Sequence, residues 1–294
     1  MHYRITHTTD YRYDRAVALA PHVVRLRPRS DGSQVLRSFH LAINPMPQGQ
    51  SQVLDLDGNA VVKFWFDPQK RTEGLKLVTT SEVETLRTNP FDYLLEPWAL
   101  TLPIAYPDWL RSQLLPYLYG QGATLPYGLT LAAEPVAVQL AQTLLQEVDG
   151  KTDIFLTALA QRIPEACSYQ VRQRGAPYPP GVTWQKKQGS CRDFVVLFME
   201  VCRAVGLAAR FVSGYQELDS AADEQHLHAW AEVYLPGGGW RGYDPTQGTM
   251  VTDRYVAVAA SALPNGAAPV TGAIRGAGMQ AEAKALLSMQ AIAG

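Results

Sequence analysis

The stretch that decides the fold is residues 189–206, GSCRDFVVLFMEVCRAVG. Its apolar residues recur at intervals of three and four, which predicts an amphipathic helix that ends at Gly206. Ser190 is a good N-cap, and Asp193 three residues later resembles the partner in a capping box, although Glu or Gln is more usual there. The pattern therefore places Cys191 on the first turn of a helix.

A cysteine at the start of a helix is well placed to act as a nucleophile. The free backbone N–H groups and the positive end of the helix dipole favour its thiolate, and Arg192 adds a positive charge. The backbone N–H of Cys191 can supply half of an oxyanion hole. Tyr169 and Trp184 are candidates for the second donor.

Two predicted strands, 228–235 and 240–244, follow this helix and are joined by a glycine-rich turn. Because side chains alternate along a strand, the length of the turn decides which face each residue occupies. A three-residue turn at 236–238 puts Asp244 diagonally opposite His228 on the same face, within hydrogen-bonding reach. A four-residue turn without a bulge puts Asp244 on the other face.

Together these residues predict a triad in which Cys191 is the nucleophile, His228 the base and Asp244 the orienting acid. The thiolate would attack an amide carbonyl, His228 would protonate the leaving amine, and water or another amine would release the thioester. His226 suggests an alternative, a zinc site formed with His228 and Cys191. We discard it because it leaves Asp244 and the helix-capped thiol unexplained.

The rest of the chain suggests three parts. These are a β-rich N-terminal domain at 1–95, a connector at 96–134 and a catalytic domain at 135–294. In the first, apolar residues recur with period two, and Asp57-Gly58 suits the turn of a hairpin spanning 53–66. The connector is rich in proline and aromatic residues. The catalytic domain opens with two helical patterns, which stop at Gly150 and Pro164.

The composition describes a globular protein and argues against several partners. Hydrophobic residues make up 47% of the 294, and charged residues 18%. A net charge of −1 gives no general field for attracting nucleic acid or an anionic membrane surface. The N-terminus lacks a continuous apolar segment, and no stretch approaches the length that spans a bilayer. We expect a cytoplasmic protein that acts on a peptide or amide substrate, with no nucleic-acid or membrane partner.

The three cysteines are expected to be thiols, because their number is odd and they lie close in sequence. No CxxC pair occurs, so a zinc ribbon or finger lacks its ligands. Cys167 and Cys202 are expected to be buried apolar side chains, as most free cysteines are. Cys202 in particular falls on the apolar face of its helix.

Several blocks of sequence resemble a known family. They are GSCRDF at 189–194, RAVGLAARFVSGY at 203–215, HAWAEVY at 228–234 and GWRGYDPT at 239–246. In this order they resemble the bacterial transglutaminase-like core. Residues 3–29 are similar to the β-rich region that precedes this core in one bacterial subgroup. The resemblance therefore covers nearly the whole chain.

The resemblance implies an α+β fold, with a papain-like core of helices packed on an antiparallel sheet. It implies catalytic roles for Cys191, His228 and Asp244 and no metal or organic cofactor. It also implies that the tail from Thr271 returns to the sheet, although residues 282–287 have helical propensity. The implied activity is cysteine-dependent acyl transfer on a peptide, glutaminyl or γ-glutamyl amide, with hydrolysis favoured over crosslinking.

Some residues depart from the family pattern. Arg192 stands where a neutral polar side chain is expected, and Val195-Val196 replace small and histidine residues, so the rim of the site differs. Related enzymes with similar triads, the arylamine acetyltransferases and peptide glycanases, match the surrounding motifs less well. A non-catalytic binding scaffold is the alternative from another class. The presence of both Cys191 and His228 argues against it.

Overall fold

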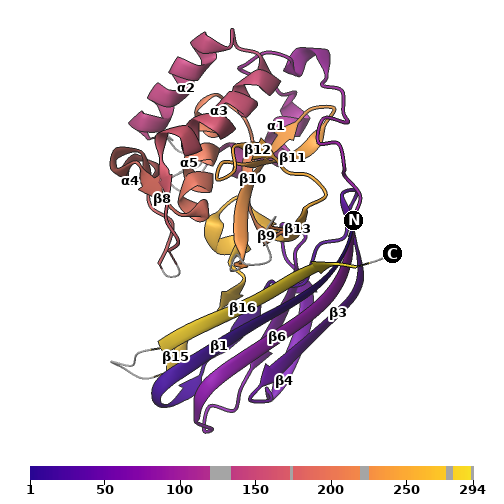
Figure 1. The fold of residues 1–294 in the computed structure, drawn as a ribbon, viewed down its shortest axis with the longest axis vertical. Helices are drawn as coiled ribbons and strands as arrows, with labels where there is room; N and C mark the ends of the chain where they lie inside the picture. Colours follow the sequence, from indigo (N-terminus) through magenta and orange to yellow (C-terminus); the bar gives the residue numbers. More distant parts are fainter. Residues whose placement is uncertain (120–133, 173–174, 219–224, 276–280, 293–294) are drawn as a thin grey trace.

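The structure, a computed structural model, describes residues 1–119, 134–172, 175–218, 225–275 and 281–292. Long strands form one half of the molecule, and helices packed on a smaller sheet form the other (Figure 1). The fold class is α+β, as predicted. None of the described helices is both long and apolar enough to cross a membrane.

The β-rich half is a sandwich of two antiparallel sheets. Its strands are β1 (His2–Leu19), β2 (His22–Val24), β3 (Gln34–Asn44), β4 (Gly49–Leu54), β5 (Ala60–Trp65), β6 (Thr72–Thr85), β14 (Val270–Thr271), β15 (Ile274–Arg275) and β16 (Ala281–Ala291). One sheet has the order β15-β1-β6-β3, with β16 also paired to β1, and the other has the order β14-β2-β5-β4. Apolar side chains from both sheets fill the space between them: Val17, Leu19, Val24, Leu26, Val62, Phe64, Leu75 and Leu77.

The predicted hairpin joins β4 to β5. Leu54 pairs with Ala60, and the turn between them contains Gly58 at φ +74°, a conformation that glycine adopts without strain. The Asp55 carboxylate accepts a hydrogen bond from the backbone N–H of Asn59 at 2.9 Å, which stabilises the turn. The hairpin prediction is confirmed, but the turn begins at Asp55, two residues earlier than the predicted turn at 57–59.

The other half contains the helical elements and the second main sheet. Its elements are η1 (Pro97–Ala99), α1 (Asp108–Leu118), α2 (Pro135–Glu147), α3 (Thr152–Ala166), β7 (Ser168–Tyr169), α4 (Pro180–Lys186), β8 (Gln188–Gly189), α5 (Cys191–Ala204), β9 (Ala209–Gln216), β10 (His228–Leu235), β11 (Gly239–Asp244), β12 (Thr249–Met250), β13 (Tyr255–Ser261) and η2 (Pro264–Ala267). The sheet order is β12-β11-β10-β9-β13. Helix α5 packs on β9 and β10 through its buried apolar face.

The helix α3 continues past the predicted stop at Pro164 and ends at Ala166. A proline fixes φ near the helical value, so the last turn can contain it at the cost of one N–H donor and of crowding at the carbonyl four residues earlier. The backbone N–H of Cys167 closes this turn on Ile163 O at 2.9 Å. The predicted end was therefore two residues too early.

Part of the predicted connector is regular structure. Helix α1 buries Leu110, Leu114 and Leu118, which are spaced by four and pack beside Ala208. The prolines of the connector predict broken structure, whereas this short apolar period forms a helix. Residues 120–133, the remainder of the connector, lie outside the described residues.

The C-terminal tail is a strand, as the family resemblance implied and local propensity did not. Strand β16 pairs antiparallel with β1 from Tyr3–Ala291 to Tyr13–Ala281. Eleven residue pairs along an otherwise open sheet edge outweigh the small intrinsic preference of this segment for helix. Through β14, β15 and β16 the chain thus returns from the helical half to both sheets of the β-rich half (Figure 1).

Candidate active site

Cys191 is the first residue of α5, at the point where the helix leaves the core. The backbone N–H and the hydroxyl of Ser190 both donate to Asp193 Oδ2, at 2.8 and 2.7 Å. The predicted pairing of Ser190 with Asp193 at the helix start is confirmed. Cys191 is partly exposed, whereas its neighbours along the same helix face are buried. Its thiol is therefore accessible at the free N–H groups of the first helical turn.

Asp193 does more than cap the helix. Its side chain is fully buried, and Arg172 donates to its two oxygens at 2.6 and 3.3 Å. The backbone N–H of Tyr178 donates to it at 2.7 Å. Burial by itself raises the pKa of Asp193, but the hydrogen bonds from Ser190, Tyr178 and Arg172 outweigh it and hold the pKa below its ordinary value. Asp193 thus ties Arg172 and Tyr178 to the helix that carries Cys191.

The strands β10 and β11 have the register that the triad requires. Leu235 pairs with Gly239 and Ala231 with Tyr243, so the turn has three residues, as predicted. Gly237 in this turn has φ +85°, and a Cβ there would collide with the carbonyl oxygen of Leu94. Glycine is therefore needed both for the turn and for the close approach of the chain.

His228 and Asp244 consequently face each other across the sheet. His228 Nε2 lies 2.7 Å from Asp244 Oδ2, which leaves Nδ1 for the Cys191 thiol, the second hydrogen-bond partner of the imidazole. The Asp244 side chain is fully buried, and the His228 side chain is 10% exposed. All three predicted residues meet at one place, at the end of α5 and the adjoining ends of β10 and β11.

The electrostatics favour a charged imidazole. Burial lowers the pKa of His228, but the charge of Asp244 and the hydrogen bonds to Asp244 and Cys191 outweigh burial, so the pKa is raised above its usual range. Asp244 shows the opposite balance: burial raises its pKa, and His228 and two further hydrogen bonds lower it. His228 therefore holds a proton at neutral pH beside an ionised Asp244.

Two hydrogen bonds to Asp244 were not predicted. The backbone N–H of Thr246 donates to Oδ1 at 2.8 Å, and the Tyr255 hydroxyl donates to Oδ2 at 2.9 Å. Thr246 lies two residues beyond Asp244, so a turn of this kind was readable locally. Tyr255 comes from β13, which two strands separate from β11 in the sheet order, and no local sequence signal indicates it.

Tyr169, one of the two oxyanion donors expected from the sequence, lies near Cys191. It pairs with Gly189 in the short parallel ladder β7–β8, directly before Ser190 and Cys191. Burial, followed by the negative charges of Cys191 and Asp244, raises the pKa of Tyr169 to about 12. The phenol is therefore a protonated donor at neutral pH.

Trp184, the other proposed oxyanion donor, lies on α4 with the Lys187 ammonium 3.2 Å from its ring centre.

The remaining cysteines are structural. Cys202 is completely buried and Cys167 is 4% exposed, and burial raises the pKa of both thiols. His226, which sequence alone could pair with His228 as a metal site, is exposed. Among the described residues, no three His, Cys, Asp or Glu side chains gather where they could hold a metal ion.

Comparison with known proteins agrees with this architecture. Residues 3–84 match the bacterial transglutaminase-like N-terminal region, and residues 138–245 match the transglutaminase-like superfamily. A protein of Mycobacterium tuberculosis is 30% identical over 272 residues, which cover 87% of this chain and 82% of the relative. The chain belongs to the transglutaminase-like superfamily.

Two further matches place this transglutaminase-like chain among known structures and enzymes. A crystal structure of a candidate cysteine protease from Cytophaga hutchinsonii matches with a TM-score of 0.69 at 18% identity, and covers 99% of this chain and 98% of that one. This shows a shared fold along the whole length. A Pseudomonas aeruginosa protein named protein-glutamine gamma-glutamyltransferase is 31% identical over 128 residues, which are 40% of this chain and 19% of that protein.

Proposed function

We propose that this protein is a cysteine-dependent acyl-transfer enzyme that cleaves a peptide, glutaminyl or γ-glutamyl amide through a thioester. Cys191 is the nucleophile, His228 the base and acid, and Asp244 the orienting carboxylate. The observation that supports this most directly is the position of His228, which is hydrogen-bonded to both Asp244 and Cys191. Such a nucleophile, base and orienting group in series activates a thiol.

The first half of the reaction forms the thioester. The Cys191 thiolate attacks the amide carbonyl carbon, a C–S bond forms, and the carbonyl electrons move to the oxygen. The backbone N–H of Cys191, free at the start of α5, can donate to this oxyanion, and Tyr169 is our candidate for the second donor. The His228 imidazolium then gives its proton to the amine nitrogen as the C–N bond breaks.

The second half releases the acyl group. His228, now neutral, takes a proton from water, and the hydroxyl oxygen attacks the thioester carbon. The C–S bond breaks, the acid leaves, and the thiolate and imidazolium are restored. Asp244 keeps its charge throughout and stabilises the imidazolium in the correct orientation.

We favour water over an amine as the acceptor, and therefore a protease or amidase over a crosslinking enzyme. The match along the whole chain is with a candidate cysteine protease. The relative named as a gamma-glutamyltransferase matches over less than half of the chain. The two acceptors give different products from the same thioester, so one experiment separates them.

The experiment screens a library of peptides and simple amides for mass adducts on Cys191, with and without added methylamine. We expect an acyl adduct that is absent in Cys191→Ala and present in Cys202→Ala, the matched change of a buried thiol. Release as the free acid indicates hydrolysis, and release as the methylamide indicates transfer.

A parallel measurement follows alkylation of Cys191 by iodoacetamide at pH 7. If His228→Ala leaves this rate unchanged and no adduct forms, the enzyme proposal is wrong and the binding-scaffold alternative takes its place.

A further inference from the structure

The carboxylate of Asp244 is held by a relay that extends beyond the three catalytic residues. Gln216 Nε2 donates to the Tyr255 hydroxyl at 2.9 Å, and this hydroxyl donates to Asp244 Oδ2 at 2.9 Å. The same oxygen is 2.7 Å from His228 Nε2. The Tyr255 oxygen accepts a hydrogen bond from the Gln216 amide, so its own hydroxyl proton is directed at Asp244. The ring of Trp230 packs edge-on against Tyr255 at 5.4 Å between centres and restricts its position.

The strand that carries Tyr255 is an edge strand, and the β-rich half holds its outer edge. On one side β13 pairs with β9, and on the other no strand of the described residues pairs with it. The Gln34 side chain takes the place of a neighbouring strand. Its Nε2 donates to Ala257 O at 2.9 Å, and its Oε1 accepts from Ala257 N at 2.7 Å. Gln34 is 2% exposed, so water cannot substitute for these bonds.

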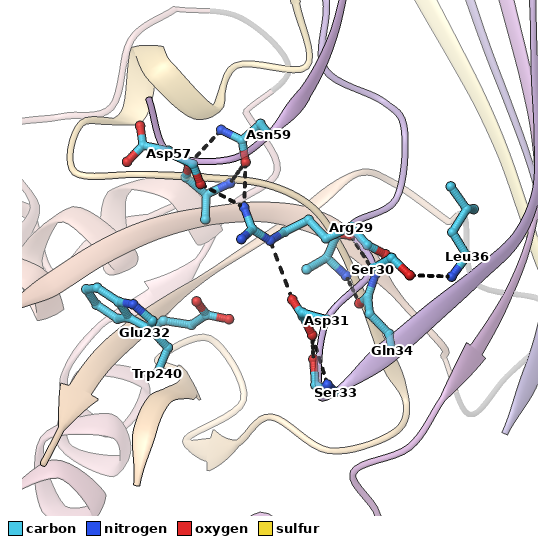
Figure 2. A network of polar contacts seen from close by, with 12 residues as sticks. Arg29, Ser30, Asp31, Ser33, Gln34, Leu36, Asp57, Asn59, Glu232 and Trp240 are labelled. Carbon is cyan, nitrogen blue, oxygen red and sulfur yellow. Dashed lines mark hydrogen bonds and ion pairs between the residues drawn. The ribbon is translucent and has the colours of Figure 1, made fainter. Parts of the chain in front are cut away.

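A second side-chain amide repeats the arrangement three residues along β13. Asn59, from the turn between β4 and β5, donates to Ala260 O and accepts from Ala260 N, both at 2.8 Å, and it is completely buried. Arg29 fixes this amide in turn, because its Nη1 donates to Asn59 Oδ1 at 2.7 Å while its Nε lies 3.6 Å from Asp31 (Figure 2). The side-chain amides of Gln34 and Asn59 therefore bond backbone N–H and C=O groups on the outer edge of β13 that would otherwise lack a partner.

We propose that Tyr255 is a positioning residue for Asp244, and that the β-rich half, through Gln34 and Asn59, holds the strand that carries it. This rests on the proposed function, since Asp244 matters only if His228 and Cys191 react. It assigns a role to the N-terminal region: the region keeps the orienting carboxylate of the other half in place. Catalytic geometry then depends on the docking of the two halves.

The alternative is that Tyr255 makes only a structural hydrogen bond. A matched control separates the two, because Tyr215 is also a buried tyrosine of the same sheet, and its hydroxyl lies 3.1 Å from His7 Nδ1 in the β-rich half. Tyr215→Phe removes the hydroxyl that reaches His7, and it leaves the backbone pairing of β9 with β13 and the hydrogen bonds of Asp244 and His228 in place. Tyr255→Phe keeps the ring against Trp230 and removes the bond to Asp244.

The test measures the rate of Cys191 alkylation by iodoacetamide between pH 5 and 9, and kcat and KM for a substrate found in the adduct screen. The groups that face Asp244 are His228 from β10, Tyr255 from β13 and Tyr169 from β7. Without Tyr255 the carboxylate is less well oriented toward the imidazolium, and the thiolate fraction falls. For Tyr255→Phe we expect kcat to fall about tenfold with KM unchanged, because losing a hydrogen bond to a charged group changes an equilibrium or rate by at least about tenfold. Alkylation near pH 7 is expected to slow several-fold. Tyr215→Phe is expected to stay within about twofold of the wild type in both rates.

A second variant tests the contribution of the β-rich half. Gln34→Met removes both bonds to Ala257 without introducing a charge, and its melting temperature is followed in parallel. At a temperature where it is fully folded, we expect slower alkylation of Cys191 than in Tyr215→Phe. An unchanged alkylation rate in folded Gln34→Met would overturn the role of the β-rich half.

The outcomes separate this inference from the proposed function. If His228→Ala slows alkylation but Tyr255→Phe matches Tyr215→Phe, the positioning role is wrong and the triad stands. If His228→Ala has no effect on alkylation and no acyl adduct forms on Cys191, the proposed function itself fails.

Discussion

The change of Asp244 to Asn tests the triad most stringently, because it preserves shape while removing charge. In the protein Asp244 accepts three hydrogen bonds: Oδ1 accepts from Thr246 N–H, and Oδ2 accepts from Tyr255 and is the partner of His228 Nε2. If the amide oxygen of Asn accepts from the Thr246 N–H, the NH2 group of Asn faces Tyr255 and His228, which both donate to the carboxylate in the wild type. If the amide flips, the NH2 group opposes the Thr246 N–H. Neither orientation preserves the existing bonds.

The consequence falls on the imidazole. The arrangement with the oxygen on Thr246 is satisfied only if His228 Nε2 becomes an acceptor, which moves the proton to Nδ1, toward Cys191. A neutral His228 in this tautomer cannot take the thiol proton, and the imidazolium has lost its buried counter-charge. For a histidine in a triad, replacing the carboxylate by the amide lowers kcat by about 10⁴, or about 5 kcal/mol of transition-state stabilisation. We expect a loss of about 10³ to 10⁴ here.

The assay compares Asp244→Asn with Glu232→Gln, a carboxylate-to-amide change on the neighbouring strand β10. Glu232 pairs with Arg210 at 2.6 Å and does not touch the triad. Turnover of a substrate from the adduct screen and alkylation of Cys191 at pH 6 to 8 are measured for both variants, with circular dichroism as a check on folding. If folded Asp244→Asn keeps turnover and alkylation within tenfold of Glu232→Gln, the assignment of Asp244 is refuted.

Three other changes follow from the structure. Cys191→Ala is expected to abolish turnover, because it removes the nucleophile. Its melting temperature is expected to stay nearly unchanged, because the thiol lies at a helix end. Residual turnover of more than about 1% of the wild-type rate, measured after purification free of wild-type enzyme, would contradict the mechanism. Asp193→Asn is expected to lower the free energy of unfolding by about 3 kcal/mol at pH 7, because it leaves Arg172 without its buried counter-charge, as urea titration can measure. The pKa of Asp193 is lowered in the folded state, so its contribution to stability is present above the unfolded pKa near 4 and is lost as pH falls through the lower folded value. The wild type should therefore lose more stability than Asp193→Asn between pH 5 and 2. Equal slopes of unfolding free energy against pH for the two proteins would argue against this. Gly237→Ala introduces a side chain at φ +85° against Leu94 O and is expected to destabilise the fold by about 2 kcal/mol or more; a melting temperature equal to the wild type would show that the turn can relax.

The parts of the site that could be predicted depend on neighbours in sequence. Ser190, Cys191 and Asp193 lie within one helical turn, so the cap and the exposed thiol follow from local geometry. His228 and Asp244 are joined by a hairpin, and the length of its turn fixes which face each occupies. In both cases a few backbone hydrogen bonds determine the arrangement.

The elements that could not be predicted depend on contacts between distant segments. The end of α3 and the helix α1 were missed because proline was given more weight than short apolar periods. Arg172 reaches Asp193 from a separate segment, and Tyr255 reaches Asp244 from the far edge of the sheet. For β16, local propensity favoured helix, and only the family resemblance indicated a strand.

The sequence alone thus predicts the helix that begins at Cys191 and the hairpin that aligns His228 with Asp244, because helix caps and turn lengths are local constraints. Tertiary structure alone decided how Asp244 is held and what surrounds it. Tyr255 acts from β13, and β13 is completed by Gln34 and Asn59 of the other half, about 200 residues away along the chain. A single side-chain amide carries no signal of its partner in the sequence, because its two hydrogen bonds can be made to any exposed backbone edge that folding brings within reach.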